Sequence, residues 1–176
     1  MRLLPLLSLL FLLAEATSSH AGNPASAIPP NIVSVPNLFQ YTPPAGWQIA
    51  NIPNGQFPAA EDKQAGEVKG LITVDMDTSA SPLDEWCKNC LEKNTRVFAD
   101  YSPVFTGLRL FGTTAGISGY SSFLQLNIGG KKIHFIYYFF AGSNNARFAV
   151  TCTCSADSAA HYDPLFEKAA KTFTPY

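Results

Sequence analysis

The sequence of 176 residues lacks an excess of charge of either sign. Twelve Lys and Arg stand against 13 Asp and Glu, the formal net charge is −1, and the charges form no runs. Electrostatic binding to nucleic acid or to an anionic membrane surface is therefore not expected. Only 14% of the residues are charged and 47% are hydrophobic, which is typical of a folded domain and excludes a disordered chain.

Histidine is scarce, with three in the chain, and no glycine-rich phosphate-binding motif occurs. Hydrolytic chemistry therefore has little support. His134 stands among aromatic residues and is interpreted as a buried or edge residue of a strand. His161 is close in sequence to Asp157 and Asp163, a trio that could hold a cation weakly. The two Asp residues are better explained as favouring the positive end of a helix. No metal or other cofactor is expected.

No apolar run is long enough to cross a bilayer. An apolar run covers residues 3–14, 12 residues after a positively charged start, which is typical of a signal peptide. Small residues at Ser19 and Ala21 predict cleavage after Ala21. We expect residues 1–21 to be removed and the chain to be exported, periplasmic or secreted, with no membrane span after cleavage. The alternative is an uncleaved membrane anchor.

The mature chain is expected to begin with a linker and to continue as one domain. Residues 22–37 contain four Pro among small polar residues and are interpreted as a flexible or polyproline-like spacer. Neither a second linker nor an internal repeat occurs after it. We therefore place a single domain at residues 38–176.

The first half of this domain mixes strands with one helix. Residues 39–42 favour a short strand with residues 46–49 as its hairpin partner, and residues 52–69 favour a loop. Residues 71–77 alternate between apolar and polar side chains, so one face is expected in the core and the other in solvent. The apolar set is Ile72, Val74 and Met76, and the polar set is Thr73, Asp75 and Asp77.

A helix should follow, with Ser81 as its N-cap, Pro82 at its first position and its end between residues 93 and 99. Apolar residues recur along it at steps of three and four, which predicts one buried face. That face consists of Leu83, Trp86, Cys87, Cys90 and Leu91.

The second half favours strands joined by tight turns. Strands are expected at residues 108–114, 120–128, 131–140 and 147–154, because Gly-Gly and Gly-Ser-Asn-Asn turns separate the last three. Residues 131–140 are apolar or aromatic on both faces, which indicates a central strand covered on both sides. A final helix is expected at residues 159–172. The fold class is α+β, a central antiparallel sheet of about six strands with helices packed on its faces.

Several short motifs resemble the PsbP-like superfamily, which includes PsbP, the Ran-binding Mog protein and small bacterial envelope proteins. They are YTPPAGW at residues 41–47, SPLDEW at 81–86, ISGY at 117–120 and FAVT at 148–151. The resemblance implies an α/β/α sandwich without shared catalytic machinery. It also implies a role in binding proteins or assisting assemblies, and it matches no binding residue position by position.

The four cysteines carry the most specific chemistry in the sequence. Cys87 and Cys90 form a Trp-Cys-x-x-Cys motif, so a thiol–disulfide oxidoreductase is one alternative, although both lie beyond the helix N-terminus that would activate a thiolate. With Cys152 and Cys154 they could form a zinc site, which an oxidising compartment disfavours. If the helix packs on the strand face of Cys152 and Cys154, all four sulfurs converge. We then expect one or two disulfides between helix and strand, with either helix-to-strand connectivity open. The alternative is four reduced, buried thiols that act as small hydrophobic residues.

The sequence therefore predicts an exported, non-catalytic binding or assembly module whose partner is another envelope or secreted protein. A carrier of a small apolar ligand is a further alternative, because Phe135, Tyr137, Tyr138, Phe139 and Phe140 could line an apolar groove as well as a core.

Overall fold

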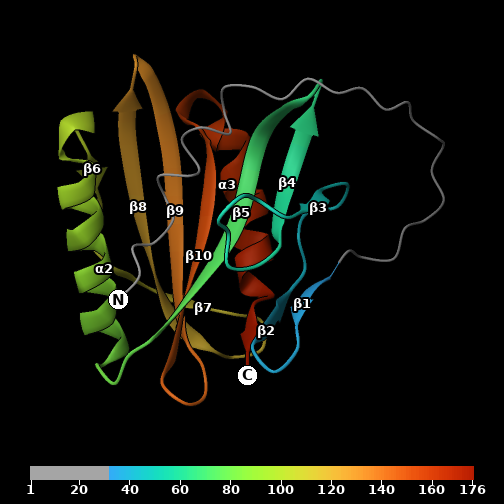
Figure 1. Ribbon diagram of the computed structural model, residues 1–176, viewed down its shortest axis with the longest axis vertical. Helices are drawn as coiled ribbons and strands as arrows, with labels where there is room; N and C mark the ends of the chain where they lie inside the picture. Colours follow the sequence, from blue (N-terminus) through green and yellow to red (C-terminus); the bar gives the residue numbers. More distant parts are fainter. Residues whose placement is uncertain (1–31) are drawn as a thin grey trace.

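The computed structural model describes residues 32–176 as a large sheet, a small sheet and two long helices (Figure 1). The strands of the large sheet are β3 (Gln48–Ala50), β4 (Ala59–Gln64), β5 (Glu67–Thr78), β6 (Val104–Phe105), β7 (Arg109–Gly112), β8 (Ser118–Ile128), β9 (Lys131–Ala141) and β10 (Ala146–Ser155). They pair antiparallel in the order β3-β4-β5-β10-β9-β8-β6, and β7 also pairs with β8. The sheet thus has eight strands where about six were expected.

The helices cover opposite faces of this sheet. They are α2 (Leu83–Val97) and α3 (Ala159–Lys171), and single turns of 3₁₀ helix, η1 (Ala99–Tyr101) and η2 (Ala156–Ser158), adjoin them. The contacts of α2 are mainly with β8 and β9, whereas α3 packs on β9 and β10. The predicted α+β class and sandwich architecture are confirmed. Within residues 32–176, no helix is long and apolar enough to cross a membrane.

The predicted hairpins in the second half are confirmed. β9 pairs antiparallel with both β8 and β10. Its turns use positive φ angles, 57° and 80° at Gly129 and Gly130 and 52° and 61° at Asn144 and Asn145. Gly and Asn tolerate this left-handed region best, so the turn residues favour tight hairpins locally. The two long helices also lie where the periodicity placed them, although α2 begins at Leu83 without a side-chain cap from Ser81.

The hairpin expected at the start of the domain is wrong. The hairpin partner of β2 (Phe39–Tyr41) is not residues 46–49, because β3 pairs with β4 in the large sheet. Instead, β2 lies between β1 (Val33–Val35) and β11 (Thr174–Pro175) in the small sheet. Trp47 explains the separation, since its buried ring packs edge-on against Tyr162 and Phe166 of α3 and holds this segment over the helix.

β1 also lies inside the stretch expected as linker, so the described fold begins before Leu38. The predicted signal peptide at residues 1–21 and the first part of that linker lie outside the described residues.

Residues 52–69 are not one loop, because they contain β4 and the start of β5. The alternation that marks a strand is weak here. Ala59, Ala60 and Glu61 are all buried in succession, and the strand then ends in charged residues. The register with β5 also shifts between Asp62 and Lys63, which breaks the period of two that a sequence pattern would reveal.

The β4–β5 turn provides a test of local strain. Ala65 has a φ of 50°, a region in which Cβ clashes with the backbone at a cost of about 1 kcal/mol or more. We expect Ala65→Gly to raise the free energy of unfolding by about 0.5–1 kcal/mol, measured by urea denaturation. The matched control is Ala160→Gly in the exposed first turn of α3, which should lower it by a similar amount. A loss of stability in both variants would contradict the strain.

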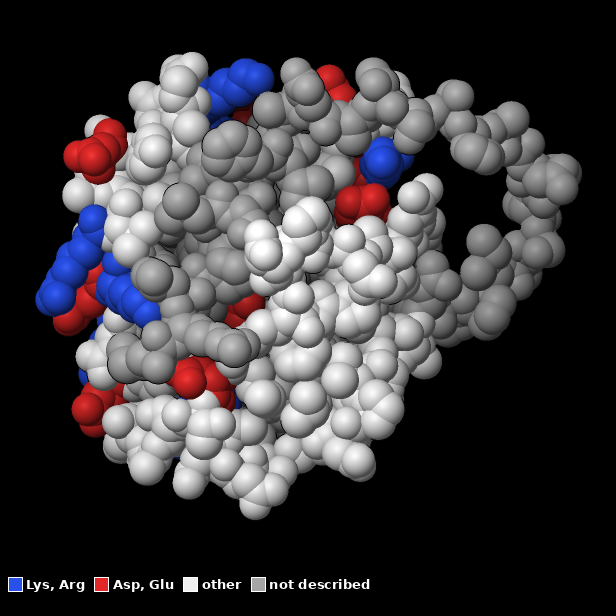
Figure 2. Space-filling view, in the orientation of Figure 1, with Lys and Arg blue, Asp and Glu red and all other residues white. Residues whose placement is uncertain are grey.

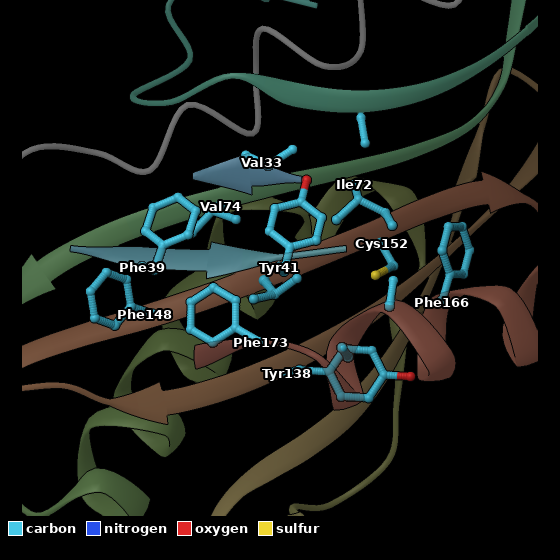
Figure 3. Packing of buried hydrophobic residues seen from close by; sticks show 14 of the residues in the cluster. Val33, Phe39, Tyr41, Ile72, Val74, Tyr138, Phe148, Cys152, Phe166 and Phe173 are labelled. Carbon is cyan, nitrogen blue, oxygen red and sulfur yellow. The ribbon is translucent and has the colours of Figure 1, made fainter. Parts of the chain in front are cut away.

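The core is divided by the sheet into two aromatic clusters. On the α3 face, Phe39 and Phe148 lie beside Phe173, which follows α3 (Figure 3). The ring of Phe140 stacks on Phe173 as well. On the α2 face, Trp86 of α2 packs edge-on against Phe139. Both faces of β9 are therefore buried, as its sequence indicated.

Surface charge on the described residues is sparse and mixed. Figure 2 shows acidic and basic side chains side by side over α2, without a broad area of one sign in this view. Residues 32–60 contain no Lys, Arg, Asp or Glu, which explains the uncharged area over β1 and β2. The structure thus offers no extended basic surface in this view for nucleic acid.

Candidate functional site

The four cysteines do not form one site. Cys87 and Cys90 of α2 belong to the cluster beneath that helix, whereas Cys152 and Cys154 of β10 belong to the cluster beneath α3. Figure 3 shows Cys152 in that second cluster with Ile72 and Phe166. All four are free thiols in the structure, which shows none of the expected helix-to-strand disulfides, and the sheet separates the two pairs. A zinc site that uses all four is excluded for the same reason.

The periodicities themselves were right. Cys87 and Cys90 lie on the buried face of α2, and Cys152 and Cys154 lie on one face of β10 with Phe148 and Val150. What failed was the assumption that α2 covers that face. The sequence spacing shows which residues share a face but not which helix covers it.

Burial suppresses the chemistry of these thiols. Desolvation, with a smaller effect of neighbouring groups, raises the pKa of Cys87, Cys90 and Cys154 to about 12, and it also raises that of Cys152. A redox-active or nucleophilic cysteine needs a pKa near or below neutrality. The thiol–disulfide oxidoreductase therefore gains no support from the Trp-Cys-x-x-Cys motif.

We expect all four thiols to be unreactive in the folded protein. Because a pKa raised by about three units lowers the thiolate fraction about 1,000-fold, iodoacetamide at pH 8 should label the native protein at least about 100-fold more slowly than the urea-unfolded protein. Mass spectrometry of the labelled peptides measures each site. Rapid labelling of Cys87, or insulin reduction that is lost in Cys87→Ser, would contradict this expectation and favour the enzyme.

The histidines are not arranged as a metal centre. Asp163 approaches His134 rather than His161, with 2.9 Å between Oδ1 and Nε2, although the angle is not that of a hydrogen bond. His161 instead contacts the ring of Tyr162 edge-on. Within residues 32–176, no three His, Cys, Asp or Glu side chains come together in a way that could hold a metal ion. His134 is buried, and its contact with Asp163 joins β9 to α3.

The aromatic residues of β9 pack against one another and their neighbours. The rings of Phe135, Tyr137 and Phe139 are stacked in sequence on the α2 face, and Tyr138 contacts Phe111 on the other face with 4.6 Å between ring centroids. These contacts are those of a core. They give no specific support to an apolar groove for a small ligand.

A set of polar side chains on the α2 face of β5, β9 and β10 is the strongest candidate site. We call it the polar face, and its residues are Thr73, Asp75, Tyr137, Thr151 and Thr153. The register brings them together, because Thr151 lies opposite both Thr73 and Tyr137, and Ala149 lies opposite Asp75. The other face of β5 and β10 is apolar, with Ile72, Val74 and Val150 in the core.

Polar groups on this face are buried without partners. The hydroxyls of Tyr137 and Thr153 have no hydrogen-bond partner among the described residues, although Tyr137 is only 2% exposed and Thr153 5%. The Asn94 side chain of α2 lies at the Tyr137 hydroxyl without the geometry of a full hydrogen bond. A buried hydroxyl without a partner costs about 1–3 kcal/mol. Such groups are therefore usually paired, with protein groups or with ordered water, and two of them lie together on this face.

Asp75 adds a carboxylate to the polar face. Burial raises its pKa to about 6, and its negative charge contributes to a raised pKa of Tyr137, so the two side chains are close enough to interact. Ala149 separates Asp75 from Phe139 across the strands and leaves a small side chain at this point. The sequence analysis took Asp75 as part of a solvated strand face. The structure shows instead that it is only 8% exposed.

Among the described residues, one acidic group and one basic group lie next to this carboxylate in the register of β5 and β10. Asp77 follows it on β5 and is exposed, and Arg147 of β10 lies opposite Asp77. Arg147 is engaged elsewhere, since Nη2 donates to the Ser81 carbonyl at 2.8 Å and Nη1 to that of Ala146 at 3.1 Å. No hydrogen bond or ion pair to Asp75 forms among the described residues.

Comparison with known proteins places the fold. No family model and no curated protein matches the sequence. The solution structure of cyanobacterial PsbP (CyanoP) from Synechocystis sp. PCC 6803 matches with a TM-score of 0.62 and 10% identity over 88% of this chain and 98% of that chain. LpqN of Mycobacterium tuberculosis, described as involved in cell envelope biogenesis, matches with a TM-score of 0.58 and 10% identity over 85% and 86%.

The Ran-binding protein Mog1p of Saccharomyces cerevisiae matches with a TM-score of 0.55 and 12% identity over 84% of this chain and 96% of that chain. At these identities the likeness concerns the fold, and it confirms the PsbP-like architecture that the sequence motifs predicted. The fold alone assigns no residue of this chain to a function.

Proposed function

We propose that this protein is an exported, non-catalytic module that binds another envelope or secreted protein through the polar face. The observation that carries the proposal is that two buried hydroxyls, of Tyr137 and Thr153, have no partner among the described residues, beside a carboxylate, Asp75, that makes no ion pair there. Two solved structures of this fold agree with such a role, since one is described as Ran-binding and another as involved in envelope biogenesis.

Export is the second part of this proposal. It rests on the apolar run at residues 3–14 and on the small residues before Gly22. N-terminal sequencing of protein isolated from the periplasm or the medium should begin at or near Gly22. A membrane-bound form that begins at residue 1 or 2 would contradict it.

A capture experiment with matched variants tests the binding function. The protein is immobilised and exposed to an envelope extract of its host, and retained proteins are identified by mass spectrometry. Thr73→Arg places a bulky cation on the polar face at a half-buried position, whereas Ala160→Arg makes the same addition on the exposed side of α3. We expect a partner that the wild type and Ala160→Arg retain and that Thr73→Arg loses. Equal retention by both variants would contradict the polar face as the binding surface.

A further inference from the structure

We propose that the polar face binds a basic side chain, Lys or Arg, of the partner protein, with its ammonium or guanidinium group between Asp75 and Tyr137. This proposal rests on the binding function above and names the chemistry of the group that is recognised.

The charge on this face is uncompensated. Asp75 makes no ion pair within residues 32–176, and Arg147 directs Nη1 and Nη2 to backbone carbonyls. A carboxylate that is 8% exposed is stabilised strongly by an opposite charge, because solvent screens the pair little. An anionic ligand would be repelled at this position, and an apolar one would leave the carboxylate desolvated and unpaired.

The hydrogen-bonding groups match a cation that has several donors. The Tyr137 hydroxyl lacks a partner among the described residues and can accept a hydrogen bond, the Asn94 amide lies beside it on α2, and Thr151 is the neighbour of Tyr137 on β10. An ammonium group carries three donors and a guanidinium group five, and neither accepts. A single basic side chain can therefore satisfy Asp75 and the hydroxyl together.

The residue at the centre of this site has a small side chain. Ala149 lies between Asp75 and Phe139 across the strands, so the side chain at the centre of the site is a methyl group. The contacts of α2 with the sheet are mainly with β8 and β9, on the Tyr137 side.

The binding should depend on pH through Asp75. The charged groups on the same face as Asp75 are Asp77 of its own strand, Arg147 of β10 and Glu61 of β4. The other titratable groups there are Tyr137 of β9 and Cys90 of α2. Tyr137 and Cys90 have raised pKa values and stay neutral below pH 8. Because a cation binds the ionised carboxylate, the affinity should be constant above about pH 7. It should fall about tenfold for each pH unit below the Asp75 pKa of about 6.

The test uses a matched pair of small probes with the purified protein. Nα-acetyl-arginine methylamide carries a guanidinium group, and Nα-acetyl-citrulline methylamide has the same shape without the charge. Chemical shifts of the Asn94 side-chain amide and the Thr151 backbone amide report binding by NMR. We expect saturable shifts with the arginine probe at a roughly millimolar Kd, and at least about tenfold weaker binding of the citrulline probe.

Variants make the outcome decisive. Asp75→Asn should weaken the arginine probe at least about tenfold, whereas Asp157→Asn, at an exposed position outside the polar face, should leave it unchanged. Equal binding of the two probes, or unchanged binding by Asp75→Asn, would overturn the proposal. A micromolar Kd for the isolated probe would also overturn it, because it would assign the site to a free small cation. The probe experiment needs neither the partner protein nor export. If it fails, the capture experiment can still show that the polar face binds a partner through a different chemical group.

Discussion

Phe173→Ala is expected to lower the free energy of unfolding by about 3–5 kcal/mol. The ring is fully buried and contacts those of Phe39, Phe140 and Phe148 at centroid distances of 5.3, 4.9 and 5.6 Å. Its removal leaves a cavity where the small sheet, the large sheet and the end of α3 meet, and neighbours on three elements cannot all move into it. Equilibrium urea denaturation followed by circular dichroism measures the change.

Leu110→Ala is the matched control for this loss. Leu110 is 83% exposed on β7, so its truncation removes apolar area without a cavity and should change the free energy by no more than about 0.5 kcal/mol. A loss below about 1.5 kcal/mol for Phe173→Ala would show that the three-element junction contributes less than its packing indicates.

Asp75→Asn is expected to stabilise the protein by up to about 3 kcal/mol at pH 7–8 and by almost nothing near pH 4. Burial raises the pKa of Asp75 from 3.8 to about 6 in the folded state. The folded protein therefore binds the proton more tightly than the unfolded chain. The wild type loses stability as pH rises from about 4 through 6, after which the loss is constant. The Asn variant carries no charge and escapes this loss.

The measurement is the free energy of unfolding of both proteins from pH 4 to pH 8. Asp157→Asn, which removes an exposed carboxylate, should follow the wild type within about 0.5 kcal/mol at every pH. A wild type whose stability relative to Asp75→Asn rises with pH would contradict the raised pKa. If Asp75→Asn is more stable and also loses the arginine probe, the carboxylate is kept at a cost to stability, as is common at binding sites.

Local features of the sequence were sufficient for the second half of the fold. The turns at Gly129–Gly130 and Asn144–Asn145 favour positive φ, and short turns force the strands on either side to pair antiparallel. The helix expected at residues 159–172 is likewise α3. In the first half such signals were weak or misleading, since β4 carries a register shift, and Trp47 packs on a helix more than 100 residues later.

The candidate site shows the same division. Alternation alone placed Thr73, Asp75 and Asp77 on one face of β5, and it placed Cys152 and Cys154 on one face of β10, which the structure confirms. The elements packed over a strand face decide whether it is solvated, buried under a helix or left with unpaired polar groups. A pattern within one strand holds no information on those elements.

The sequence by itself thus determined the periodicities, the tight turns and the antiparallel meander, because each depends on residues near one another in the chain. Only the tertiary structure decided that α2 and α3 lie on opposite faces, that the cysteine pairs are separated and that Asp75 and Tyr137 meet. The reason is physical. A strand or helix period fixes the direction of side chains relative to their own element, whereas the side of the sheet on which a helix packs is fixed by the path of the connecting chain and by burial summed over the whole core.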